Sequence, residues 1–147
     1  MNEKILRELN KELQGVIMGQ NEIMKLVEKA KDYKIIELLD TTLSIAEKHK
    51  SLIGEEVKRL DGDPAEDEGT WGKILEIFNA IKESDVDTDK EVLQTAIKGT
   101  EMGFKAILDF LIKEENLDED FKKKLVDLSE EYTDNIRDMG EYLITLD

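Results

Sequence analysis

Hydrophobic residues recur at intervals of three and four in four long segments of this chain. Such steps return to the same side of an α-helix, so each segment predicts an amphipathic helix that buries one face. The segments cover about residues 3–29, 33–60, 89–113 and 118–143. Four helices of this length are enough to build a closed bundle around one core. The pattern predicts an all-α fold with a single four-helix-bundle domain over residues 1–147.

The residues between the segments predict where the helices begin and end. The run Thr88-Asp89-Lys90-Glu91 is a capping box, and Asp118 places a capping side chain before the last segment. The run Asp61-Gly62-Asp63-Pro64 combines a permissive glycine with a proline that cannot continue a helix. Only short turns separate the first two segments and the last two, so each pair is expected to be antiparallel.

The long connection between the second and third segments carries a helical pattern of its own. Its apolar residues, which fall on one helical face, are Trp71, Ile74, Leu75, Phe78 and Ile81. They predict a short extra helix over about residues 70–82. A bundle whose connections are short, long and short has the connectivity of ferritin-like proteins.

Local sequence runs in this connection also resemble a known family. The order of helices, together with Leu60-Asp61-Gly62-Asp63-Pro64 and Gly69-Thr70-Trp71-Gly72, resembles an uncharacterised bacterial family of ferritin-like proteins. The resemblance extends over nearly the whole chain and implies a ferritin-like four-helix bundle. Relatives of that fold include iron stores, rubrerythrins and di-iron oxidases, so the resemblance raises the question of bound iron or manganese.

The usual di-iron ligands are missing from the sequence. A carboxylate-bridged di-iron centre in such a bundle takes a Glu-x-x-His pair from each of two helices. The chain has one histidine, His49, and Ala46 stands three residues before it. A divergent metal site would draw on Glu47, His49 and Glu101, which lie at the edges of the hydrophobic stripes. The simpler interpretation places His49 as a partly exposed residue at the boundary of the core.

Each hydrophobic stripe contains one polar position. These positions are Gln20, Lys50, Thr100 and Tyr132. The hydroxyls of Thr100 and Tyr132 are predicted to satisfy each other, because buried polar groups need partners. A buried polar layer of this kind either fixes the packing of the helices or lines a small ligand cavity.

Small residues gather on one face of the third segment. Ala96, Gly99, Gly103 and Ala106 form a strip, and Gly15 and Gly19 have the same spacing in the first segment. Glycine inside a helix costs about 1 kcal/mol relative to alanine, which suggests a packing reason for these positions. The strip predicts the close approach of another element: the 70–82 helix, the first helix, or a second copy in a homodimer.

Charge and composition narrow the range of partners. The chain has 36 acidic and 21 basic residues, a formal net charge of −15, and no cysteine. This charge disfavours nucleic acid and anionic membrane surfaces, and the lack of cysteine excludes thiolate sites. The chain shows neither a membrane-spanning run nor a leader pattern, so a cytoplasmic location is expected.

No arrangement of residues typical of an enzyme is visible in the sequence. It lacks a phosphate-binding glycine loop, a nucleophile elbow and a catalytic triad pattern, so no catalytic residue is predicted. We therefore expect a non-catalytic binding or assembly module without a cofactor, whose protein partner is unknown. The alternative is a divergent metal-binding or redox protein that uses His49 and the boundary carboxylates.

Overall fold

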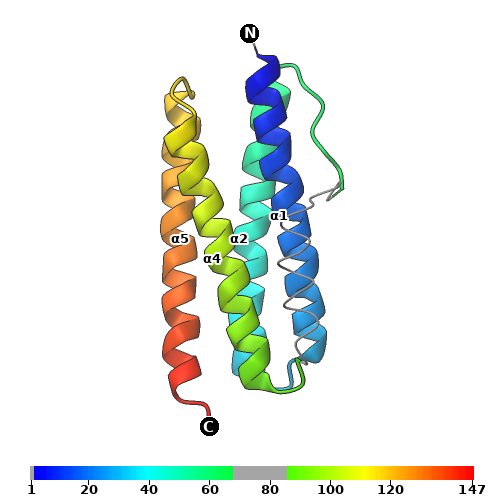
Figure 1. The fold of residues 1–147 in the computed structure, drawn as a ribbon, viewed down its shortest axis with the longest axis vertical. Helices are drawn as coiled ribbons and strands as arrows, with labels where there is room; N and C mark the ends of the chain where they lie inside the picture. Colours follow the sequence, from blue (N-terminus) through cyan, green and yellow to red (C-terminus); the bar gives the residue numbers. More distant parts are fainter. Residues whose placement is uncertain (1, 68–85) are drawn as a thin grey trace.

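The structure, a computed structural model, describes residues 2–67 and 86–147. These residues form four helices and no strand: α1 (Glu3–Lys29), α2 (Tyr33–Arg59), α4 (Asp89–Lys113) and α5 (Glu119–Ile144). The helices lie alongside one another along the long axis of the molecule (Figure 1). The predicted all-helical fold with four long helices is therefore confirmed. The short helix predicted over 70–82 lies outside the described residues.

The caps predicted from the sequence are present at the starts of α4 and α5. The Thr88 hydroxyl accepts a hydrogen bond of 3.1 Å from the backbone N–H of Glu91 and donates one of 2.9 Å to the Glu91 carboxylate. The Asp118 carboxylate accepts from the N–H of Phe121 at 3.1 Å. Each cap satisfies a backbone donor that has no partner inside its own helix.

The end of α2 differs in detail from the expected glycine stop. Asp61, and not Gly62, adopts the left-handed conformation, with a φ of 62°. The N–H of Gly62 then closes the helix by donating to the Val57 carbonyl at 2.9 Å. A Cβ atom on Gly62 would lie 2.6 Å from Cδ2 of Leu6. A side chain at position 62 would therefore require Leu6 of α1 to shift.

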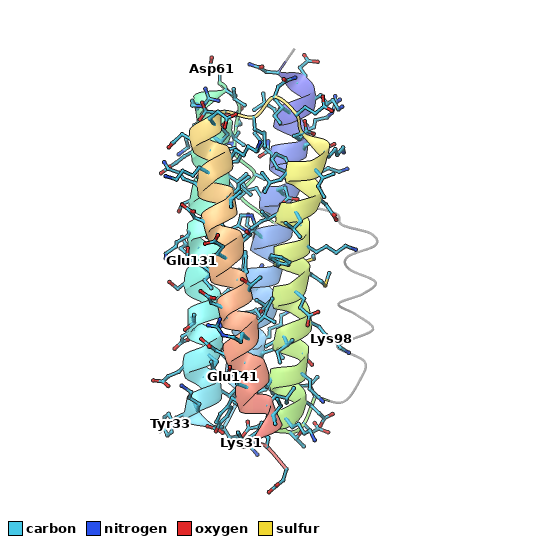
Figure 2. The ribbon with its side chains drawn as sticks, turned by 90° about the vertical axis from the view of Figure 1, so that its left-hand side faces the viewer. Lys31, Tyr33, Asp61, Lys98, Glu131 and Glu141 are labelled. Atoms are coloured by element: carbon cyan, nitrogen blue, oxygen red, sulfur yellow. The ribbon has the colours of Figure 1, made fainter. Side chains whose placement is uncertain are left out.

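Contacts at both ends fix how the helices lie together. The side chain of Asn10 in α1 accepts from the N–H of Ala65, just beyond α2, at 2.9 Å. At the other end, the N–H of Lys31 donates to the Asp89 carboxylate at 2.8 Å. Lys31 and Asp61 mark these opposite ends in Figure 2. Within the bundle, α1 packs against α2 and α4, and α5 packs against the same two helices.

The buried apolar side chains form two clusters, one toward each end of the bundle. The larger cluster includes Leu13, Ile53 and Leu125, and the smaller one includes Leu39 and Met139. All four helices contribute to both clusters. No helix among the described residues is long and apolar enough to span a membrane. Three buried polar side chains, Thr42, Thr100 and Asn135, lie between the residues of the two clusters along their helices.

Candidate functional site

A cavity of about 270 Å³ lies where the two hydrophobic clusters meet. Its walls come from all four helices, with most of the lining residues on α1 and α4. The described lining residues are Glu12, Gly15, Val16, Met18, Gly19, Gln20, Ile23, Thr42, Ala46, His49, Gly99, Thr100, Met102, Gly103, Ala106, Asp109 and Tyr132. Most of this surface is apolar, and a few polar groups converge on it. That combination is typical of small-molecule sites.

Glycines form the wall where α1 faces α4. A Cβ atom built on Gly19 would meet no atom within 4 Å. On Gly103 it would lie 3.4 Å from the Cζ atom of Tyr132, which is ordinary contact. The helix therefore does not need a glycine at position 19 for close packing. The missing side chain leaves space inside the bundle instead.

His49 is the most deeply buried polar group in the wall of this cavity. Its side chain is only 1% exposed, so the expectation of a partly exposed boundary residue is wrong. The Nδ1 atom lies 2.9 Å from the hydroxyl oxygen of Tyr132, and the two rings meet edge to face. The Nε2 atom makes no hydrogen bond with any described residue. Burial lowers the pKa of His49 to about 3, so the ring is neutral at physiological pH.

Glu12 of α1 faces His49 across the cavity. Its Oε2 atom lies 3.9 Å from Nε2 of His49, too far for a direct hydrogen bond, and its side chain is 17% exposed. Burial, with smaller effects of the negative charges on Asp109 and Glu8, raises the pKa of Glu12 to about 8. Glu12 is therefore largely protonated at pH 7, and the two residues form no ion pair.

Tyr132 completes this group from α5. Burial, with the nearby charges of Glu12 and Glu131, raises its pKa above the ordinary range of a tyrosine. The phenol therefore keeps its proton. Three polar groups that line the cavity are thus mainly uncharged at pH 7: the carboxyl of Glu12, the imidazole of His49 and the phenol of Tyr132.

A second polar pair lies close by, between α2 and α5. The Thr42 hydroxyl is 2.6 Å from Oδ1 of Asn135, and the Asn135 amide donates to the Leu38 carbonyl at 3.3 Å. Both side chains are almost fully buried. Because these polar atoms satisfy one another, the pair is a structural contact that fixes α5 against α2. Thr42 also lines the cavity.

Three of the four polar positions predicted from the stripes line the cavity, and one does not. Thr100 and Tyr132 are buried, and Gln20 lines the cavity while donating to the exposed Glu47 at 2.7 Å. Lys50 is partly buried and does not line it. The predicted bond between Thr100 and Tyr132 is wrong: Thr100 donates to its own helix, at the carbonyl of Ala96, and Tyr132 bonds His49.

The three residues considered for a divergent metal site do not come together. His49 points into the bundle, whereas Glu47 and Glu101 are exposed on α2 and α4. Within residues 2–67 and 86–147, no three histidine, aspartate or glutamate side chains are grouped so that they could hold a metal ion. The geometry of this part of the chain gives the metal alternative no donor set.

The small-residue strip of α4 faces the cavity and α1. Gly99, Gly103 and Ala106 line the same cavity as Gly15 and Gly19. Ala96 is fully buried in the smaller hydrophobic cluster. Among the described residues, α1 faces this strip across the cavity. The 70–82 segment, which was also considered for this strip, lies outside the described residues.

Sequence reasoning missed Glu12, the burial of His49, and Asn135, although a signal for them exists. A helical row one position away from the chosen stripe of α2 carries Thr42 and His49 seven residues apart. The row consists of Ile35, Leu38, Thr42, Ile45 and His49, and all five side chains are buried. In α1, a row with the same spacing carries Glu12. The buried face of each of these helices is wider than one hydrophobic stripe. Polar residues beside the stripe are therefore buried, although the stripe alone does not include them.

The protein is thus a four-helix bundle with a cavity whose walls are mainly apolar and carry a few polar groups. Residues 4–114 match the family described as a domain of unknown function, DUF2383. Because the match covers most of the chain, the protein belongs to this family. The matched residues supply Glu12 and His49, whereas Tyr132 of α5 lies beyond them. Comparisons with curated proteins and with solved structures gave no match.

Proposed function

We propose that this protein is a non-catalytic binding module that holds a small, largely apolar molecule inside its four-helix bundle. The cavity has suitable walls, because Val16, Met18, Ile23 and Met102 offer apolar contact from two helices. Its polar groups gather around His49 and Glu12. A ligand with an apolar body and one polar group would match both parts of the wall.

One observation carries this proposal: Nε2 of His49 is buried in the cavity wall without a partner among the described residues. Leaving a buried polar atom unpaired costs about 1–3 kcal/mol. The glycine wall adds a second cost, because glycine is less favourable than alanine within a helix by about 1 kcal/mol. A ligand that fills the space and bonds His49 would offset both costs.

The architecture and setting of this module are part of the same proposal. The long connection between α2 and α4, flanked by two shorter ones, supports a ferritin-like arrangement of antiparallel helices. The sequence resemblance supports a bacterial origin. The cysteine-free, acidic composition supports a cytoplasmic location. Neither point identifies the ligand, which is a question for the cavity itself.

The test is an NMR titration of the ¹⁵N-labelled protein with benzyl alcohol, a compact probe with an apolar body and one hydroxyl. We expect saturable amide shifts centred on the cavity-lining residues of α1, α2 and α4. Gly19→Met, which fills the space, should abolish them. Gly54→Met is the matched control, because Gly54 also has open space around its Cβ position but lies away from the cavity.

Two results would overturn the proposal. One is the absence of saturable shifts in the wild-type protein at any soluble probe concentration. The other is equal binding to the wild-type protein and to Gly19→Met, since the probe would then occupy a different place. Circular dichroism of both variants shows that they remain helical.

A further inference from the structure

The cavity is lined by acidic side chains and by no lysine or arginine among the described residues. Glu12 and Asp109 line it, and Glu8 lies close enough to Glu12 to raise its pKa. Lys113 lies near this side of the bundle, but its amine pairs with Glu8 at 3.1 Å. With a formal net charge of −15 on the whole chain, the cavity favours a cation over an anion.

The two facing polar atoms can both accept hydrogen bonds. In the tautomer in which Nδ1–H of His49 donates to the Tyr132 oxygen at 2.9 Å, Nε2 carries a lone pair that can accept a hydrogen bond. The Glu12 oxygen opposite accepts once its proton is lost. These two atoms lie 3.9 Å apart, so a single donor atom can lie within hydrogen-bond distance of both. An ammonium group carries three donors and no acceptor, and it suits this arrangement better than a hydroxyl with its single donor.

We propose that the ligand of this cavity is a protonated amine with a compact apolar body. Its ammonium group lies between Oε2 of Glu12 and Nε2 of His49, and its body lies along the wall formed by Gly19 and Gly103. This inference rests on the proposed binding function and names the chemical class of its ligand. A bare metal ion fits less well, because the described residues offer no group of three ligands.

Binding of such an amine must displace the proton of Glu12. Four groups face this carboxyl: Glu8 on its own helix, His49 on α2, Asp109 on α4 and Tyr132 on α5. His49 stays neutral because burial lowers its pKa to about 3, and Tyr132 stays protonated. Glu12, with a pKa of about 8, is therefore the interior group that changes charge between pH 6 and 8. The affinity for the amine should rise by about tenfold from pH 6 to 7 and by about fivefold from pH 7 to 8, and close to one proton should be released per amine bound at pH 7 or below.

The experiment compares three probes of nearly the same shape: benzylamine, benzyl alcohol and toluene. Titrations followed by NMR at pH 7 measure their affinities for the wild-type protein. We expect benzylamine to bind at least about tenfold more tightly than benzyl alcohol, because charge-assisted hydrogen bonds are about twice as strong as neutral ones. Calorimetry of benzylamine binding in buffers of different ionisation enthalpy counts the released proton.

Two variants separate the role of Glu12 from that of overall charge. Glu12→Gln should reduce benzylamine binding to the level of benzyl alcohol and remove its pH dependence. Glu28→Gln, at an exposed position of the same helix, makes the same chemical change away from the cavity and should alter neither. Binding of benzyl alcohol to Glu12→Gln shows that the cavity of this variant is intact.

The outcomes distinguish this inference from the function on which it rests. Equal binding of all three probes, or benzylamine binding that is unchanged in Glu12→Gln, would overturn the amine assignment while leaving the binding cavity in place. Failure of every probe to bind would contradict the proposed function as well.

Discussion

At the scale of single residues, the buried pair of His49 and Tyr132 determines the character of the interior. Each ring supplies one polar atom to the other, and burial keeps both uncharged. Glu12 is the exception among the buried groups of the cavity, because its pKa of about 8 lies within an accessible pH range. Its proton is therefore the one whose loss should change stability near neutral pH.

The stability of the protein should fall as the pH rises from about 6.5 to 8. Over most of this range Glu12 is largely protonated in the folded state, and it is ionised in the unfolded state, where its pKa is near 4.5. The folded state binds more protons, so the free energy of unfolding decreases by about 1.4 kcal/mol per pH unit, or about 2 kcal/mol in total. Urea unfolding at pH 6.5, 7.25 and 8 measures this change.

Below pH 6.5 the titration of His49 should cancel the effect of Glu12 on the free energy of unfolding. The folded pKa of His49 is lowered from 6.5 to about 3, so its contribution to stability increases with pH up to 6.5. Between pH 4.5 and 6.5 the two slopes have opposite signs and cancel. Glu12→Gln should remove the decline between pH 6.5 and 8. A decline of the same size in this variant would assign the effect to another group.

The residues of the site could be predicted from the sequence only in part. Thr100 and Tyr132 interrupt an apolar stripe, and their burial follows from that position. The hydrogen-bond partner of Tyr132 cannot be predicted in the same way, because the spacing of apolar residues does not determine how each helix is rotated about its own axis. The rotation of α2 brings the row of Thr42 and His49 to the centre of the bundle. Long-range contacts such as that between His49 and Tyr132 appear only once this rotation is known.

At the scale of elements, α1 and α4 are helices that carry glycines where good helix formers are expected. Gly19 and Gly103 lie in the middle of these helices, and both line the cavity. At Gly19 the missing side chain leaves open space, at some cost in helix stability. Such a compromise between stability and a binding site is common at functional positions.

Gly19→Ala should therefore stabilise the protein while it weakens ligand binding. The new methyl group meets no atom, and alanine favours the helix by about 0.5–1 kcal/mol. Urea unfolding measures the gain. Gly54→Ala should give a similar gain without affecting binding of benzyl alcohol. A loss of more than about 1 kcal/mol in Gly19→Ala would indicate tight packing at this position and would rule out the assigned open space.

Helices and their ends were the most predictable level of this protein. The capping side chains of Thr88 and Asp118 lie where the local sequence places them, because a cap depends only on neighbouring residues. The glycine strip was predicted as a contact surface. In the structure Gly99, Gly103 and Ala106 line the cavity, and the close approach of another element to this strip stays a prediction, because spacing shows which residues share a face but not how far away the opposite helix lies.

At the scale of the whole molecule, the two hydrophobic clusters stabilise the two ends of the bundle. The cavity and its polar groups lie where these clusters meet. The helix ends are tied by capping and by contacts such as that between Asn10 and Ala65. This division allows the middle of the bundle to carry the unpaired Nε2 atom of His49 while the hydrophobic clusters supply the stability. A mid-bundle position for a ligand site is common among helical bundles.

The most direct test of this account is a crystal structure of the protein under xenon pressure. Xenon occupies apolar cavities without needing any particular hydrogen bond, so it detects the space independently of the ligand's chemistry. We predict an anomalous peak inside the bundle, between α1 and α4 beside Gly19 and Gly103. An interior with no xenon, in which the side chains around these glycines are packed together, would contradict the central claim that the bundle encloses a binding cavity.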